Sequence, residues 1–279
     1  MFFKGHCETE LLSRRSILFL GLVTVLSYFT FFHGYSNPPH LFWDENYHVA
    51  SAQKYLNGVY FMEQHPPFGK LLIAAGELLV DANRADHQFI TSDYVKNLPQ
   101  DFSFAGYRLF PILFAWLTAP VLFLILLLIT RSDNPSLLFS FLYIFDNALI
   151  VHSRGAMLEG TLLFFCALML MLYLLHLRWK DKKKLFYTVS LLFGVSFGLV
   201  ITTKLVGLIM ILLIPALVWQ LWGRWRQLAA CFGITAIGFF AAYASVWQVH
   251  FALGDHVIDE LPDNGYYQAS EAYKSYLDS

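Results

Sequence analysis

The chain has 279 residues, of which 57% are hydrophobic and 14% are charged, and its formal net charge is -1. A soluble domain is nearer 45–50% apolar and about 25% charged, so a soluble globular fold is excluded and the surplus apolar surface points to lipid. The balanced charge, with no strongly basic segment outside short loops, argues against nucleic-acid binding.

Seven apolar stretches approach the roughly 20 residues that cross the hydrocarbon core of a bilayer, which predicts an all-α integral membrane protein. In chain order they are residues 16–32, 109–129, 137–151, 158–177, 185–203, 205–222 and 228–250. The first stretch follows two arginines and has no small-residue cleavage site after it, so we expect a retained span rather than a signal peptide.

The basic residues in short loops predict the orientation of these spans. With the N-terminus inside, eleven of the nineteen Lys and Arg residues lie in the inner segments, most densely over residues 178–184. A membrane domain of residues 1–253 then carries a long first loop, about residues 34–107, on the outer side. A polar tail of residues 254–279 follows on the same side.

The three cysteines give no sign of a disulfide or a metal cluster. Cys7, Cys166 and Cys231 lie in the N-terminal tail and in apolar stretches, away from polar loops where an oxidising compartment pairs thiols. We therefore expect no disulfide and no metal cluster at the cysteines.

The first loop begins with two adjacent carboxylates, Asp44 and Glu45, about ten residues beyond the first span. Phe42 and Trp43 precede them and are residue types that collect at the headgroup level of a membrane. The pair is therefore expected to lie close to the membrane surface but in water. A solvated surface pair would have the same local sequence. The pair therefore indicates a site only in combination with the other residues around it.

The motif HPPFGK follows at residues 65–70. Two prolines suit the first turn of a helix, and apolar residues then recur at helical spacing, with charged residues on the other face. This pattern predicts an interfacial amphipathic helix over residues 67–80. His65 and Lys70 lie beside its first N–H groups, which makes them candidates for binding an anion.

Four further ionisable residues lie at the ends of later spans, namely Arg108, Arg154, Glu159 and Lys204. In the expected topology all of them fall on the same side as Asp44. Charges at such depths are costly unless they are paired or used. Snorkelling to the interface explains any one of them, but their convergence with His65 and two carboxylates favours a site.

Six motifs follow one another between about residues 41 and 253, and they read WDENYHVASAQKYLNGVYF, EQHPPFGKLLIA, YRLFPILFA, FDNALIVHSRGAMLEGTLLFF, FGVSFGLVITTKLVGL and VHFAL. In this order they resemble the protein O-mannosyltransferase family, the membrane enzymes that move mannose from a polyprenyl phosphate of the dolichyl type to Ser or Thr. The resemblance implies a membrane glycosyltransferase (GT-C-like) bundle with a catalytic first external loop and without a nucleotide-binding Rossmann domain.

The resemblance also implies roles for the residues singled out above. Asp44 matches the catalytic base of an inverting single displacement, and Glu45 matches the acid that helps to hold the acceptor. The candidates for binding the donor and its phosphate are His65, Lys70, Arg108, Arg154, Glu159 and Lys204. Two acids, Glu63 and Glu159, stand where the family usually has aspartate, which puts the sugar and the donor geometry in question.

The implied partners are a lipid-linked sugar donor, a protein Ser/Thr acceptor, the bilayer and a further subunit. No cofactor follows from the sequence, and a divalent ion is left open. The implied location is the endoplasmic reticulum membrane in a eukaryote or the plasma membrane in a bacterium. Because the family continues through more spans, the chain is expected to correspond to the N-terminal part of the family fold.

Two other functions remain open at this stage. A related enzyme could transfer another sugar, such as aminoarabinose, to a lipid or glycan acceptor. The chain could also be a transporter or an inactive membrane partner. A transporter needs polar residues or broken helices near the membrane midplane. Here the ionisable residues gather at one membrane end, which favours an enzyme.

Overall fold

The computed structural model describes residues 12–258 and 275–276, so the predictions for Cys7 and for most of the polar tail fall outside the described residues. The helices are α1 (Arg14–Ser27), α2 (Glu45–Leu56), α3 (Phe68–Val80), α4 (Leu109–Thr130), α5 (Asp133–Ile144), α6 (Asn147–Ser153), α7 (Glu159–Arg178), α8 (Lys183–Thr203), α9 (Leu213–Gln220) and α10 (Trp225–Leu253). A π-helical turn, Tyr28–Phe32, continues α1, and a 3-10 helix, Leu205–Leu212, precedes α9.

The predicted all-α membrane architecture is confirmed for the described residues. Five helices are long and apolar enough to cross a membrane: α1 with its π-helical turn, α4, α7, α8 and α10. Helices α5 and α6 make a sixth when they are counted as one span with a bend of 57°. The bend lies at Asp146, whose carboxylate caps α6 by accepting a hydrogen bond from the Leu149 N–H at 2.8 Å.

The seventh expected span, residues 205–222, is a shorter apolar helix over Leu205–Gln220. Its first eight residues form the 3-10 helix, and a 3-10 helix rises about 2.0 Å per residue, or roughly 16 Å here. The eight residues of α9 add roughly 12 Å. The stretched first half therefore brings this short segment close to the ~30 Å thickness of a hydrocarbon core.

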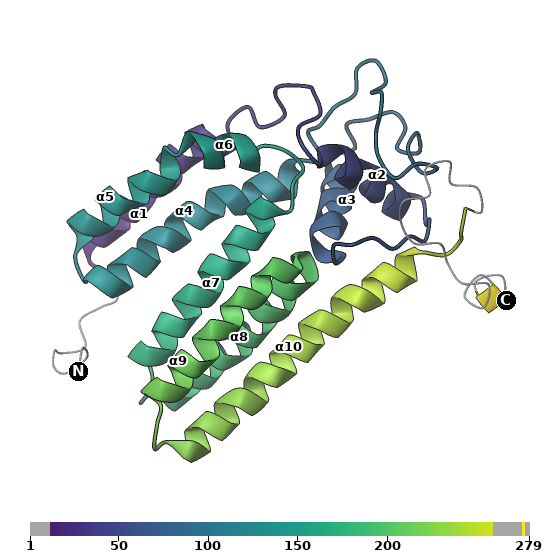
Figure 1. The fold of residues 1–279 in the computed structure, drawn as a ribbon. Coiled ribbons are helices and arrows are strands. Elements are labelled where there is room, and N and C mark those ends of the chain that lie inside the picture. Colours follow the sequence, from purple (N-terminus) through teal and green to yellow (C-terminus); the bar gives the residue numbers. More distant parts are fainter. Residues whose placement is uncertain (1–11, 259–274, 277–279) are drawn as a thin grey trace.

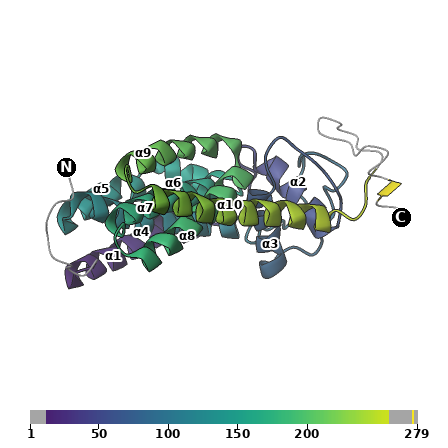
Figure 2. The same ribbon diagram turned by 90° about the horizontal axis from the view of Figure 1, so that it is seen from below.

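The long helices lie side by side, and α2 and α3 lie with the first loop at one end of the bundle (Figures 1 and 2). The N-terminal end of α1 lies at the opposite end, where Arg15 donates a hydrogen bond to Asn134 near the start of α5. Asp181 and Arg224 form an ion pair in the connections that precede α8 and α10. Polar contacts therefore join neighbouring helices at the end away from the loop.

Helices α8 and α10 approach each other through glycines. A Cβ atom added at Gly194 would collide with the backbone carbonyl of Thr235, and one added at Gly238 would lie 2.5 Å from the Leu191 carbonyl oxygen. Small residues at such positions let two membrane helices come into close contact. The glycines thus set the distance between α8 and α10. They also set the position of the end of α10 that contacts the loop.

We expect Gly194→Ala to lower the thermal unfolding midpoint of the detergent-solubilised protein, because overpacking costs about 1–3 kcal/mol. Gly233→Ala is the matched control, since nothing lies within 4 Å of its added Cβ atom. The control should be neutral or slightly stabilising, because alanine favours a helix over glycine by about 1 kcal/mol. Equal midpoints for the two variants would contradict the glycine contact.

The helix predicted over residues 67–80 is present as α3, but its charged side is not solvated. Lys70 and Glu77 are fully buried beneath the first loop, whereas Leu78 and Leu79 are 72% and 69% exposed. Exposed apolar side chains are thus confined to the C-terminal end of α3, whereas Ile73 and Ala74 are buried as the two charged residues are. Its depth in a bilayer stays a prediction.

Candidate active site

Asp44 lies in a tight turn at the start of α2. The turn from Phe42 to Glu45 is closed by a hydrogen bond of 3.1 Å from the Glu45 N–H to the Phe42 carbonyl oxygen. Aspartate is favoured before a helix because its side chain usually accepts a hydrogen bond from the first backbone N–H groups. Asp44 makes no such capping bond, and the residue is exposed. Its carboxylate is therefore available to a substrate.

Glu45, the next residue, is fully buried. Its Oε1 accepts hydrogen bonds from Arg108 Nε and from the Ala156 N–H, each at 2.7 Å. Its Oε2 accepts from Arg108 Nη2 at 2.8 Å and from the Phe42 N–H at 3.1 Å. The two adjacent carboxylates therefore lie in opposite environments, and the second holds together the loop, α4 and the connection before α7.

Arg108, at the start of α4, is almost fully buried and uses all five of its N–H groups. Two of them donate to Glu45. The other three donate to backbone carbonyl oxygens of the first loop, those of Ser36, Pro38 and His40. Its guanidinium carbon also lies 4.0 Å from the centre of the Phe104 ring. Arg108 was expected to line the donor site, but this arrangement places it within the framework of the loop.

We therefore expect Arg108→Ala to destabilise the protein by about 3–5 kcal/mol, because it leaves the Glu45 charge buried without its partner. The paired variant Glu45→Leu/Arg108→Met should recover only part of this loss, since it removes the unpaired charge but leaves the backbone groups that the pair bonded without partners. Thermal unfolding in detergent measures the stability of both variants. An Arg108→Ala protein as stable as the wild type would show that Arg108 is not part of the framework and would support its assignment to the donor site.

Lys70 is also part of the framework. Its ammonium is buried, forms an ion pair with Glu63 and donates a hydrogen bond to the His65 carbonyl oxygen at 3.1 Å. Glu63 in turn accepts a hydrogen bond from the Ser51 hydroxyl at 3.2 Å. Lys70 thus fixes the path of the chain before α3, and through it the position of His65.

Arg154 follows α6 and contacts the end of the first span. Its Nη2 donates to the carbonyl oxygens of Thr30 and His33, each at 3.1 Å. These carbonyls lie at the end of the π-helical turn, where helix geometry leaves acceptors without internal partners. Arg154 therefore joins two spans, and its Nε is buried without a hydrogen-bond partner.

Glu159 and Lys204 meet at the end of the bundle that carries the loop. Glu159 is the first residue of α7, and Lys204 is the extended residue between α8 and the 3-10 helix. Their Oε1 and Nζ atoms form an ion pair at 2.7 Å, and both side chains remain partly exposed. His152, on α6, lies in ion-pair range of the same carboxylate, with Nε2 3.8 Å from Oε2.

The imidazole of His65 lies within electrostatic reach of these groups. Burial and then Lys204 lower the pKa of His65 below its ordinary value of 6.5, while Glu159 and Asp44 oppose this shift. His65 is therefore mostly neutral at neutral pH, when it can donate one hydrogen bond but carries no charge. The structure thus brings together Asp44, His65, Glu159 and Lys204, from four separate parts of the sequence.

His48 is a member of this region that the sequence analysis missed. It is buried, its ring centre lies 6.5 Å from that of His65, and its Nδ1 has no hydrogen-bond partner. The available signal was its spacing, because residues four apart on a helix, as Asp44 and His48 are, lie on one side. Burial, followed by Lys70, His65 and Lys204, lowers the pKa of His48 well below 6.5.

This shift predicts a loss of stability in acid. Below its ordinary pKa of 6.5 His48 binds a proton in the unfolded chain but resists it when folded, so stability falls as the pH drops below that value. Between about pH 7.5 and about pH 5.5, the unfolding midpoint of the wild type should fall by at least about 3 °C more than that of His48→Gln. His87→Gln, at an exposed histidine of the same loop, should show the same fall of the unfolding midpoint as the wild type. An equal fall in all three proteins would contradict the role of His48 in this pH dependence.

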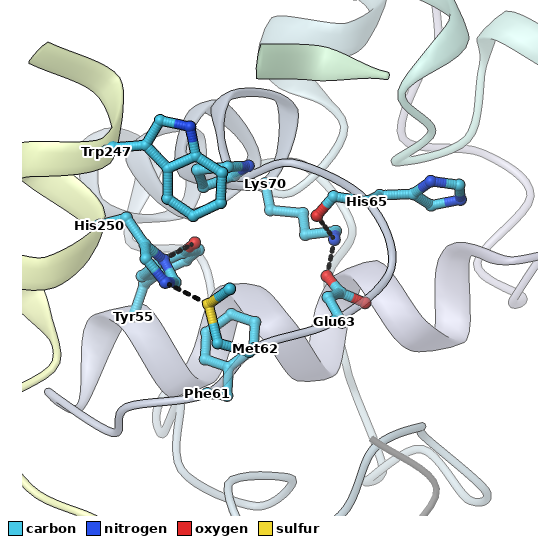
Figure 3. A pocket seen from close by; sticks show the side chains of 9 residues that line it. Tyr55, Phe61, Met62, Glu63, His65, Lys70, Trp247 and His250 are labelled. Atoms are coloured by element: carbon cyan, nitrogen blue, oxygen red, sulfur yellow. Dashed lines mark hydrogen bonds and ion pairs between the residues drawn. The ribbon is translucent and has the colours of Figure 1, made fainter. Parts of the chain in front are cut away.

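A small pocket lies between the loop and α10 (Figure 3). Its lining residues are Tyr55, Phe61, Met62, Glu63, His65, Pro67, Lys70, Trp247 and His250. His250 Nδ1 lies 2.7 Å from the Tyr55 hydroxyl, and its Nε2 lies 3.3 Å from the Met62 sulfur. The last described span is thereby fastened to the segment that leads into His65.

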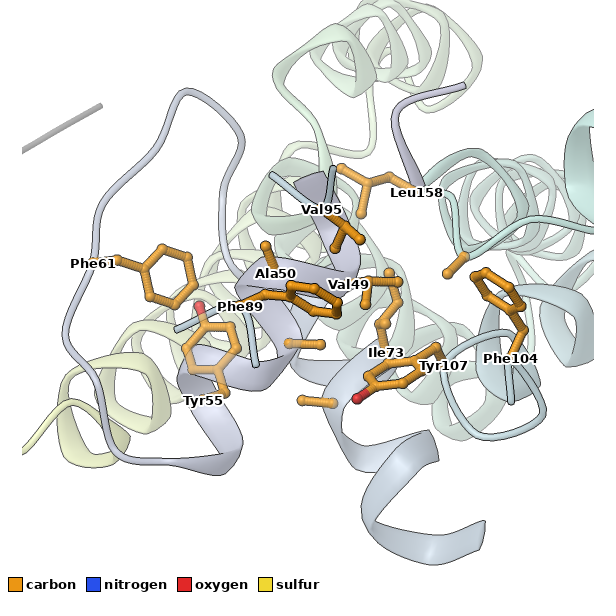
Figure 4. Close-up of a cluster of buried hydrophobic side chains, with 13 residues drawn as sticks. Val49, Ala50, Tyr55, Phe61, Ile73, Phe89, Val95, Phe104, Tyr107 and Leu158 are labelled. Carbon is orange, nitrogen blue, oxygen red and sulfur yellow. The ribbon is translucent and has the colours of Figure 1, made fainter. Parts of the chain in front are cut away.

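An apolar cluster packs around α2 (Figure 4). Val49, Ile73, Phe104 and Leu158 are among its buried members, and they come from α2, α3, the loop before α4 and the residue before α7. Glu45 and Lys70 lie on α2 and α3, and Arg108 and Glu159 follow the other two segments directly. Their relative positions are therefore set by hydrophobic packing as well as by ion pairs.

Within residues 12–258 and 275–276, no group of three or more His, Cys, Asp or Glu side chains is arranged to hold a metal ion. Cys166 and Cys231, the two cysteines in the described part of the chain, are free thiols. The absence of a disulfide and of a metal cluster at the cysteines stays a prediction.

Two solved structures share this fold. The protein O-mannosyltransferase Pmt1–Pmt2 complex of S. cerevisiae bound to the sugar donor matches 92% of this chain and 38% of its own, with a TM-score of 0.79 at 21% identity. ArnT from Cupriavidus metallidurans bound to undecaprenyl phosphate matches 85% of this chain and 41% of its own, with a TM-score of 0.52 at 16% identity. The fold is that of the membrane glycosyltransferases of the GT-C type.

The sequence identifies the family within that class. The family model described as dolichyl-phosphate-mannose-protein mannosyltransferase matches residues 21–253, and the chain belongs to this family. Mannosyltransferase 4 of Candida albicans is 32% identical over 207 residues, which are 73% of this chain and 27% of that protein. Protein O-mannosyl-transferase 2 of Danio rerio is 28% identical over 278 residues, which are 94% of this chain and 35% of that protein. The chain thus spans about a third of the length of these relatives.

Proposed function

We propose that this chain forms the catalytic part of an enzyme that transfers mannose from a polyprenyl phosphate of the dolichyl type to a Ser or Thr hydroxyl of a protein. The observation that carries the proposal is the exposed carboxylate of Asp44. It makes no capping hydrogen bond to α2, and it lies within electrostatic reach of His65. Family membership and the likeness to a donor-bound mannosyltransferase complex support it.

Asp44 is assigned as the general base. The acceptor oxygen attacks the anomeric carbon as its proton passes to the Asp44 carboxylate, and the bond from that carbon to the phosphate oxygen breaks. Attack from the face opposite the leaving group inverts the anomeric centre. A positioned base of this kind contributes about 10²–10⁴-fold to the rate.

The groups that receive the departing phosphate are fewer than the sequence suggested. Arg108, Arg154 and Lys70 are held by contacts within the framework. Lys204 remains partly exposed and is assigned as the cation for the phosphate, and neutral His65 is assigned as a hydrogen-bond donor. Glu159 holds the Lys204 ammonium in place at 2.7 Å. Such fixed groups stabilise charge that develops in the transition state.

The partners and the membrane follow from the same proposal. The chain is an integral membrane protein, and the eukaryotic origin of its relatives supports the endoplasmic reticulum membrane as its location. The solved relative is a complex of two mannosyltransferase chains, which supports a partner subunit for this chain as well. The donor is a lipid-linked mannose and the acceptor a protein with an accessible Ser or Thr.

The proposal is tested by incubating the protein in membranes with radiolabelled polyprenyl-phosphate mannose and a Ser/Thr peptide. We expect Asp44→Asn to lower kcat at least about 100-fold with little change in donor KM, because a base acts in the transition state. Lys204→Met should instead raise the donor KM about tenfold, since a phosphate-binding cation also acts in the ground state.

Two control substitutions lie in the same loop at exposed residues, Asp101→Asn and Lys96→Met, and both should leave transfer unchanged. If Asp44→Asn retained more than about a tenth of the wild-type kcat, an effect below about 1.4 kcal/mol, Asp44 would not be the base. Transfer from another lipid-linked sugar, with none from the mannose donor, would point to a related glycosyltransferase instead.

A further inference from the structure

Trp43, directly before Asp44, has an uncommon backbone conformation. Its φ is 52°, whereas Asp44 has φ -78° and ψ 6°. In a hydrogen-bonded turn from Phe42 to Glu45 these signs match a type II′ turn, whose second position is usually glycine. A bulky residue with positive φ is an outlier, and such outliers gather at functional sites where the surroundings maintain the strain.

Burial of the indole does not explain why tryptophan occupies this position. The Trp43 side chain is 72% exposed, so it gains little from packing to offset its backbone strain. Glycine would adopt the same φ without strain and would lose few contacts. The stability of the folded chain therefore does not explain the large exposed ring, and a role in binding does.

The surroundings of Trp43 place its ring at the edge of the candidate active site. The ring contacts His152 edge to face with 5.9 Å between centroids, and Phe42 in the same manner at 6.0 Å. His152 is in turn 3.8 Å from the Glu159 carboxylate, which pairs with Lys204. His152 thus connects the indole to the charged pair assigned to the phosphate.

We propose that Trp43 is an acceptor-binding residue, whose indole forms the surface against which the hydroxyl-bearing segment of a protein acceptor lies. In an inverting displacement the acceptor and the leaving phosphate lie on opposite faces of the anomeric carbon. Asp44 contacts the acceptor oxygen in the proposed reaction and Trp43 directly precedes Asp44, so the proposal assigns the Trp43 ring to the acceptor and Lys204 to the phosphate. The inference rests on the proposed function.

The chemistry of the ring fits this role. Tryptophan offers a large rigid apolar surface and one N–H donor, and such rings contribute strongly to binding peptide segments. His152 contacts the indole edge to face, and most of the indole surface stays exposed to solvent. An exposed tryptophan can also hold a loop at the headgroup level, which is a role in membrane contact and not in acceptor choice.

Steady-state transfer with separately varied donor and acceptor peptide distinguishes these roles. Trp43→Gly should raise the acceptor KM about tenfold and change the donor KM less than about twofold, because one aromatic contact is lost on the acceptor side only. Its unfolding midpoint should equal or exceed that of the wild type, since glycine relieves the positive φ. Trp43→Phe, which keeps a ring, should restore the acceptor KM to within about threefold of the wild type.

Trp219→Ala is the control for the loss of an exposed tryptophan, because Trp219 is 79% exposed on α9, outside the candidate site. It should change neither KM. An unchanged acceptor KM in Trp43→Gly would overturn the role of Trp43 alone, as would an equal rise of both KM values, which indicates membrane contact. Absence of mannose transfer by the wild type would overturn the proposed function, and this inference with it.

Discussion

The buried ion pair between Glu45 and Arg108 is the interaction on which the rest of the site depends. It joins residues 63 positions apart, and Glu45 Oε1 also accepts a hydrogen bond from the Ala156 N–H. Two buried charges are expensive to desolvate, and they become tolerable only when every donor and acceptor is satisfied. All five N–H groups of the guanidinium are satisfied here. The pair therefore holds the first loop, the start of α4 and the connection before α7 in one arrangement.

The ionisable residues at this end of the bundle divide into a framework and a reacting group. Lys70 pairs with Glu63 and donates to the His65 carbonyl oxygen, which fixes the path of the chain around His65. Arg154 donates to a backbone carbonyl oxygen at the end of the first span and fixes the chain there. Asp44 and Lys204 keep exposed atoms that a substrate can reach. The framework charges act together with the apolar cluster around α2 in holding the loop in place.

The sequence predicted the membrane fold, most spans and helix α3 because these depend on apolar periodicity, which is a local property. It could not separate the roles of Arg108 and Lys204. Both read as a cation at the end of an apolar stretch, and only tertiary contacts decide which one is enclosed. The glycines of α8 and α10 and the 3-10 geometry of Leu205–Leu212 were missed for the same reason. Only the fold brings His48 beside His65 and His152 beside Glu159.

The ion pair also explains how the turn can hold Trp43 in a left-handed conformation, which costs about 1–3 kcal/mol for a residue other than glycine. Glu45 accepts a hydrogen bond from the Phe42 N–H, so the buried carboxylate pins the residue before the turn, and Glu45 itself is pinned by Arg108. Both ends of the turn are thus fixed by one buried group. Such strain persists only where the surroundings determine the backbone more strongly than the strained residue resists. Asp44 lies inside this same turn, so the direction of its carboxylate is set by the burial of its neighbour.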